Sequence, residues 1–151
     1  MAMSASLLLL AAGLYVYAAP RPSLAPEPGI WQLDIQLHGQ PQQINVVLPG
    51  DTEPTRFWYL LYTITNNTGE DVNYYPRADL FTDTLLNYTS GAKTRRQVFE
   101  AIRQRHGAKM PLLESESQVT GPILQGEDNA RDTVAIFEDF DPQASKVQIF
   151  I

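Results

Sequence analysis

The sequence contains no cysteine in its 151 residues. This absence excludes disulfide bonds, thiolate metal ligands, a cysteine nucleophile and the lipid-bearing cysteine of bacterial lipoproteins. The chain has only two histidines, it lacks a glycine-rich loop that would hold phosphates, and none of its serines lies in a Gly-x-Ser-x-Gly context. We therefore expect no catalytic residue, no metal ligand and no cofactor, and we predict that the protein is not an enzyme.

The chain also lacks an apolar run of the length that a membrane-spanning helix needs, which is about 20 residues. Its long apolar run, Leu7 to Ala19, ends in small residues and is typical of a signal-peptide core. We predict a signal peptide over residues 1–19, cleaved near Ala18 or Ala19, and a secreted or periplasmic protein of the cell envelope. No lysine or arginine precedes the run, so an uncleaved leader that anchors the chain in a membrane is the alternative.

Prolines are concentrated directly after this run. The stretch "PRPSLAPEP", residues 20–28, predicts an extended spacer rather than packed structure. Residues 29–151 are enough for one domain, and a hydrophobic content of 44% supports a core. Because the net charge is −6 and the chain is predicted to be exported, we expect no nucleic-acid partner.

Alternating apolar and polar residues predict a series of β-strands. Residues 31–38 and 44–48 alternate in this way on either side of the turn "HGQPQ", which indicates an antiparallel hairpin. Further short strands are predicted in "VNYYP", "DLFTDT", "SQVTGPIL", "TVAIFEDF" and "KVQIFI". Short strands separated by turns favour a mainly β, two-sheet antiparallel sandwich of immunoglobulin-like type with one short inserted helix.

The segment "FWYLLYTIT", residues 57–65, has apolar residues on both faces of a strand. Its even positions form an unbroken apolar row that we predict to face the core: Trp58, Leu60, Tyr62 and Ile64. Its odd positions are apolar in the first half only: Phe57, Tyr59 and Leu61. This second apolar half-face needs a cover of its own.

The predicted helix, "RRQVFEAIRQRH" at residues 95–106, is one cover that the chain offers. Thr94 and Gln97 fit a capping box, and Gly107 fits a left-handed residue that ends the helix. The helix has a narrow apolar stripe that would pack on a flat surface: Val98, Phe99, Ala101 and Ile102. The alternative cover is a neighbouring molecule.

Two stretches carry a resemblance to known proteins, "YTITNNTGEDV" and "LQGEDNARDTVAIFEDFDPQASKVQIFI". The chain resembles exported proteins of planctomycete-type bacteria and, more loosely, an immunoglobulin-like domain of bacterial lipoproteins. In that domain a strand ending in Thr-Asn-x-Thr/Ser-Gly precedes a Gly-Glu turn, an apolar-Phe strand and an Asp-Pro turn. The resemblance covers residues 31–151 and implies the sandwich fold without catalytic residues. The chain departs from it at "DTLLNYTSG", which lacks a glycine after Asp83-Thr84.

The remaining ionisable residues offer few sites. We interpret His38 and His106 as solvent-facing, with the helix C-terminus favouring the charged form of His106. Acidic residues cluster in two late turns: Glu127, Asp128 and Asp132, then Glu138, Asp139 and Asp141. Such turns supply oxygen ligands to calcium, but their spacing fits no calcium-binding loop, so we interpret them as solvated turns.

Charge is unevenly distributed along the chain. Between Lys93 and Lys109 lie six cations against one anion, Glu100, whereas residues 110–151 hold eight carboxylates against Arg131 and Lys146. The candidate interaction surface comprises Arg95, Arg96, Arg103, Arg105 and Lys109. One interpretation places these arginines beside the acidic turns of their own domain. The other has them contact a protein partner, an anionic envelope polymer or the acidic end of another copy.

Two Asn-x-Thr sequons begin at Asn66 and Asn87, and in a eukaryotic secretory route they would predict exposed loops.

Because of the leader, the strand pattern and the lack of a catalytic motif, we expect a secreted or periplasmic, non-enzymatic interaction module. The alternative is a self-assembling structural subunit joined through edge strands or through a contact between the basic helix and the acidic end.

Overall fold

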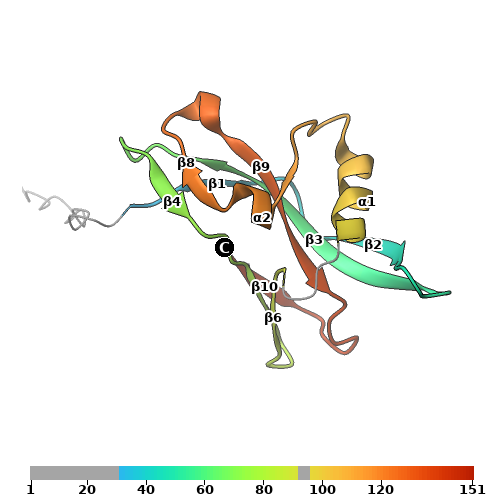
Figure 1. Ribbon diagram of the computed structural model, residues 1–151. Coiled ribbons are helices and arrows are strands. Elements are labelled where there is room, and N and C mark those ends of the chain that lie inside the picture. The colour runs from blue at the N-terminus through green and yellow to red at the C-terminus, as the bar shows by residue number, and fades with distance from the viewer. Residues whose placement is uncertain (1–30, 92–95) are drawn as a thin grey trace, which may run out of the picture. The chain divides into compact units, whose positions relative to one another are not determined.

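The computed structural model describes residues 31–91 and 96–151, so the predicted signal peptide (1–19) and spacer (20–28) lie outside the described residues. The described chain is mainly β, with several antiparallel sheets and few helices (Figure 1). In chain order the elements are β1 (Asp34–Leu37), β2 (Gln42–Val47), β3 (Pro54–Thr65), β4 (Val72–Tyr74), β5 (Asp79–Thr82), β6 (Asn87–Thr89), α1 (Arg96–His106), β7 (Glu114–Ser115), α2 (Glu116–Val119), β8 (Gly121–Ile123), the 3₁₀ turn η1 (Glu127–Asn129), β9 (Arg131–Glu138) and β10 (Val147–Phe150).

Strand β3 organises the largest sheet, in which five strands are joined. On one side it pairs antiparallel with β9, from Phe57 opposite Glu138 to Ile64 opposite Arg131. On its other side β2 pairs with its first half and β1 with its second half. The predicted hairpin between residues 31–38 and 44–48 is therefore wrong. The 12 residues of β3 are long enough to accept both short strands end to end on one edge.

The first core lies on the odd face of β3, where α1 covers the sheet (Figure 1). Phe57, Tyr59 and Leu61 are buried there beneath the helix, as predicted from the second apolar half-face. The residues that the helix buries are Val98, Phe99 and Ile102, and Ala101 packs against the cluster. Of the two covers that the sequence left open, the structure shows the helix, and no neighbouring molecule is needed for this face.

The second core lies on the even face of β3. Leu60, Tyr62 and Ile64 are buried, as predicted, whereas Trp58 is only half-buried and stacks on Phe140 with ring centroids 4.7 Å apart. The cover comes from two smaller antiparallel sheets, β10-β5-β6 and β4-β8, which contribute Leu80 and Val72 to this core. The large sheet is thus apolar on both faces because both are covered.

Several local predictions are wrong. The alternation in residues 31–38 places Trp31 and Leu37 on the same face as Leu33, which is buried, but 42% and 53% of their surfaces are exposed. Gly107 does not take a left-handed conformation; the backbone N–H groups of Lys109 and Met110 both donate to the carbonyl of His106 instead. Thr94, the residue expected to cap the start of the helix, lies outside the described residues.

The segment "SQVTGPIL" was predicted as one strand, but its first part belongs to the helical turn α2, and only residues 121–123 form strand β8. Asn66 of the first sequon was expected on an exposed loop, but it is fully buried. Its side-chain amide donates to the carbonyls of Glu70 and Ile123 at 2.8 Å each. Asn87 is exposed at the start of β6, as expected of a sequon.

Candidate functional site

A cleft of about 510 Å³ opens between α1 and the β7–α2 segment. Its floor is apolar and consists of Phe99 from the helix with Val134 and Ile136 from β9. Charged residues of α1 form one side of the cleft: Arg96, Glu100 and Arg103. Polar residues of the β7–α2 segment form the other: Ser115, Glu116, Ser117 and Gln118. A volume of this size and an apolar floor with a few polar groups are typical of small-molecule sites.

The β7–α2 wall is held in place by local hydrogen bonds. β7 pairs parallel with β9, Glu114 opposite Thr133 and Ser115 opposite Val134. The Gln118 side chain then accepts the backbone N–H of Ser115 at 2.9 Å, the reach-back of a capping box. These contacts turn the chain from an extended strand into α2 within one residue.

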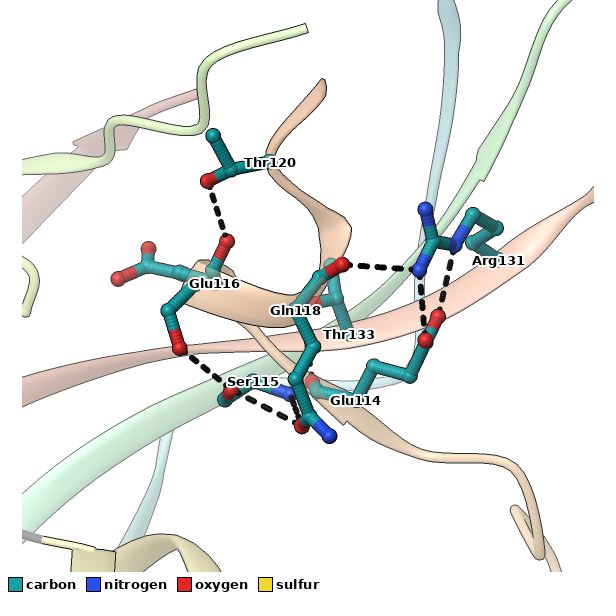
Figure 2. Close-up of polar contacts among 8 residues, drawn as sticks. Glu114, Ser115, Glu116, Gln118, Thr120, Arg131 and Thr133 are labelled. Carbon is teal, nitrogen blue, oxygen red and sulfur yellow. Dashed lines mark hydrogen bonds and ion pairs between the residues drawn. The ribbon is translucent and has the colours of Figure 1, made fainter. Parts of the chain in front are cut away.

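An ion pair fixes the outer side of this wall, as Figure 2 shows. Arg131 donates to both carboxylate oxygens of Glu114, at 2.7 and 2.6 Å, and also to the backbone carbonyl of Gln118 at 3.0 Å. Thr133 adds a hydrogen bond to the Glu114 carbonyl. The Glu116 carboxyl points to the opposite side of α2, away from Arg131 (Figure 2). Glu114 and Glu116 therefore lie in different environments, Glu114 beside a guanidinium group and Glu116 on the other side of α2.

Glu116 is the most unusual ionisable group of the cleft. Burial raises the pKa of its carboxyl from 4.5 to about 7, and the hydrogen bond from Ser90 only partly offsets this effect. The Ser90 hydroxyl donates to Glu116 Oε1 at 2.5 Å and accepts the backbone N–H of Ala78 at 3.1 Å. On the other oxygen the space is narrow, because a Cβ at Gly91 would lie 2.9 Å from Glu116 Oε2. Near neutral pH this carboxyl therefore exists in both protonation states.

Two tyrosine hydroxyls extend this polar cluster into the second core. The hydroxyls of Tyr62 and Tyr74 are buried and have no hydrogen-bond partner of acceptable geometry among the described residues. Burial is the main reason that the pKa of each tyrosine lies above its usual value, and the Glu116 carboxyl adds to the effect. Glu116 therefore lies where the cleft meets the second core.

The basic side of the cleft is only partly neutralised. Glu100 forms an ion pair with Arg103 at 2.7 Å and a looser one with Arg96 at 3.7 Å. The Arg103 guanidinium also lies over the Phe99 ring, 5.8 Å from its centroid. The acidic partner of both arginines is Glu100 of the same helix, and Arg103 also lines a second hollow together with Asp132 of the first acidic turn.

The other members of the predicted basic surface are placed differently. Arg105 turns toward β2 and β3, where it donates to the Gln43 carbonyl at 2.8 Å and to the Tyr59 hydroxyl at 3.3 Å. Lys109 follows the end of α1, and Arg95 lies outside the described residues. Of the five predicted positions, the cleft brings together Arg96 and Arg103.

Both histidines are engaged within the fold. His38 Nε2 lies 2.6 Å from the Thr63 hydroxyl, which in turn donates to Asp132 at 2.6 Å. His106 Nε2 lies 2.8 Å from the Tyr59 hydroxyl. Partial burial, with Arg105 and Lys109 nearby, lowers the pKa of His106, so the expectation that the helix end favours its charged form is wrong.

The acidic turns do not converge on one point in the described chain. Asp132 accepts the Thr63 hydroxyl, whereas Asp139 pairs with Arg56 at 2.8 Å and accepts the Trp58 indole N–H at 3.1 Å. Among residues 31–91 and 96–151, no group of three or more acidic or histidine side chains is placed to hold a metal ion. Nor does any helix in those ranges have the length and apolar character to cross a membrane.

Neither a family model, nor a curated protein, nor a solved structure matches this chain. The resemblance to exported immunoglobulin-like proteins therefore stays a prediction. Sequence reasoning also missed Ser90 and Glu116, which lie 26 positions apart and meet only in the fold. One local signal was present. Ser115 and Gln118 have the spacing of a capping box, which predicts a helix that begins at Glu116.

Proposed function

We propose that this protein is a secreted or periplasmic, non-enzymatic interaction module that binds its ligand in the cleft between α1 and the β7–α2 segment. The observation that carries the proposal is the cleft itself, which combines an apolar floor with ionisable groups on both walls. Arg96 and Arg103, two members of the basic surface predicted from sequence, line it. The partners that suit this surface are a protein or an anionic envelope polymer, or a fragment of either.

The architecture around the cleft supports a binding role. The floor residues Val134 and Ile136 belong to the strand that is paired with β3 along its length, so they are held rigidly. The β7–α2 wall is fixed by the Glu114–Arg131 pair, which does not involve Glu116, the ionisable residue of this wall that lines the cleft. A preformed site of this kind spends little free energy on ordering when a ligand enters.

A titration with a mixed panel of small molecules tests the proposal. Isotope-labelled processed protein would be titrated by NMR with anionic, cationic, zwitterionic and neutral compounds. We expect the resonances that move to belong to Phe99, Val134, Ile136 and their neighbours, and the bound compounds to be recovered unchanged. Binding elsewhere only, or chemical conversion of a compound, would refute the proposal.

Two matched variants sharpen this test. Ser117→Trp places a large side chain at the exposed mouth of the cleft, whereas Gln104→Trp places the same side chain on an exposed position of α1 that does not line it. We expect Ser117→Trp to abolish the shifts and Gln104→Trp to preserve them. Equal behaviour of the two variants would show that the cleft is not the binding site.

A self-assembling structural subunit is a second candidate, favoured by one observation. On the outer face of the β10-β5-β6 sheet, the rings of Phe81 and Phe150 pack edge to face with centroids 5.6 Å apart, yet 42% and 59% of their surfaces are exposed. β10 also lies at the end of that sheet. Light scattering tests this candidate: Phe150→Ser should lower the mass of any assembly, and a monomer at every concentration would refute it.

We also propose that the fold is the immunoglobulin-like two-sheet sandwich that the sequence resemblance implies. Its support is a core enclosed between the five-stranded sheet and residues of the smaller sheets. An experimental structure in which β4-β8 and β10-β5-β6 form one layer would support the proposal, and one in which they pack on different faces would refute it.

A further inference from the structure

We infer that the cleft binds a small monocarboxylate with an apolar body, such as a medium-chain fatty acid, with its carboxylate at Arg96 and its chain on the floor of Phe99, Val134 and Ile136. The inference rests on the proposed function, because it concerns the same cleft, and it names a small free molecule in place of the protein or polymer partner. It commits to a free molecule that enters the cleft, since the floor lies behind the ring of charged and polar side chains that surrounds it.

The charges of the α1 wall favour an anion. Two guanidinium groups, those of Arg96 and Arg103, face one carboxylate, that of Glu100. Glu100 holds Arg103 closely at 2.7 Å and Arg96 loosely at 3.7 Å, and the Arg96 side chain is 87% exposed. Arg96 is therefore the group that can turn to a ligand carboxylate without breaking a close ion pair. Guanidinium groups bind carboxylates through two parallel N–H donors.

The floor requires that the ligand also carry an apolar part. Phe99, Val134 and Ile136 are themselves well packed, so a ligand lying on them gains by removing its own apolar surface from water. A chain of about eight carbons fits comfortably within a cleft of 510 Å³. A fully polar anion has no apolar surface of its own to remove from water and would gain only the exposed ion pair, which is a weak interaction.

The Glu116 wall adds a second reason for a carboxylate. When its carboxyl holds a proton it can donate a hydrogen bond to a ligand oxygen, whereas its ionised form would repel an anion. The groups that face Glu116 are Ser90, which donates to it, and the neutral hydroxyls of Tyr62 and Tyr74; the charged groups of the cleft are those of α1. Burial raises the pKa of Glu116 to about 7, so both forms are within experimental reach.

Three probes of equal length decide the ligand class: octanoate, octylammonium and 1-octanol. Titrations of the processed protein by calorimetry and NMR at pH 6 should show octanoate binding in the cleft, with octylammonium at least about tenfold weaker. Arg96→Gln should weaken octanoate about threefold. Arg77→Gln is the matched control, because Arg77 pairs with Asp79 and does not line the cleft, and it should leave the affinity unchanged.

The pH dependence supplies an independent readout. Octanoate should bind more weakly at pH 8 than at pH 6 in the unmodified protein, and Glu116→Gln should remove most of this difference. If octylammonium binds as tightly as octanoate, or if Arg96→Gln behaves like Arg77→Gln, the ligand class is wrong. If the mixed panel still finds ligands in the cleft, that failure leaves the proposed function standing. If no panel compound binds there either, both proposals fall.

Discussion

Replacing Glu116 with glutamine should change how the stability of the protein depends on pH. Glutamine keeps the shape of the side chain and an oxygen that can accept the Ser90 hydroxyl, which lies 2.5 Å from Glu116 Oε1. It removes the ability to ionise and replaces the second carboxyl oxygen with an amide NH2 group. The comparison therefore isolates the free energy of placing a titratable carboxyl in this partly buried position.

The sign and the size follow from the raised pKa of Glu116. Because the folded protein holds this proton more tightly than the unfolded chain, the contribution of Glu116 to stability is greatest below pH 4.5. It declines as the pH rises from 4.5 to about 7, and it is constant above that range. A pKa change of this size corresponds to about 3 kcal/mol. Relative to the unmodified protein, Glu116→Gln should therefore gain up to about 3 kcal/mol of stability between pH 4.5 and pH 8.

Urea unfolding at a series of pH values, followed by tryptophan fluorescence, measures this difference. Glu53→Gln, at an exposed position between β2 and β3, serves as the control for removing one carboxyl from the surface and should change the profile by less than about 0.5 kcal/mol. If the Glu116→Gln variant and the unmodified protein differ by the same amount at pH 4.5 and pH 8, Glu116 ionises as it would in water, and the described environment of its carboxyl is wrong.

Three further predictions concern the core, a buried amide and the leader. Ile64→Ala in β3 should lower the free energy of unfolding by about 2 to 5 kcal/mol in urea titrations, whereas Leu37→Ala in β1, at a position 53% exposed, should cost less than about 1 kcal/mol; similar costs would contradict the burial of Ile64 in the second core. Asn66→Ala should cost about 1 to 3 kcal/mol because it leaves two backbone carbonyls without their donor, and in a glycosylating host mass spectrometry should find a glycan at Asn87 alone. N-terminal sequencing of the exported protein should show cleavage near Ala18 or Ala19, and an intact N-terminus would contradict the predicted signal peptide.

The parts of the fold that could be predicted from sequence are those that periodicity determines. The alternation in residues 57–65 identified two apolar faces on one strand, and the stripe of the helix at 95–106 identified a surface of matching character. Both faces are buried in the structure, one of them beneath that helix. This success depends on side-chain direction, which is a local property of a strand or helix.

The parts that could not be predicted depend on which segments meet. Strands at 34–37 and 42–47 look like the two arms of a hairpin, but both find their hydrogen-bond partner in β3, and nothing in their own residues reports this. The cleft has the same character, because Ser90 and Glu116 become neighbours only through long-range packing. A glutamate in a serine-rich stretch is indistinguishable from a solvated one until the segment that buries it is known.

The end-to-end placement of β1 and β2 on β3 has a consequence for assembly. β2 is joined to β3 by a short turn, whereas β1, which precedes β2 in the chain, covers the edge of β3 from Tyr62 to Thr65. That edge carries Ile64 of the second core. If β1 were displaced, the backbone donors and acceptors of that edge would be open to pairing with other chains, so β1 protects the largest sheet against edge-to-edge aggregation.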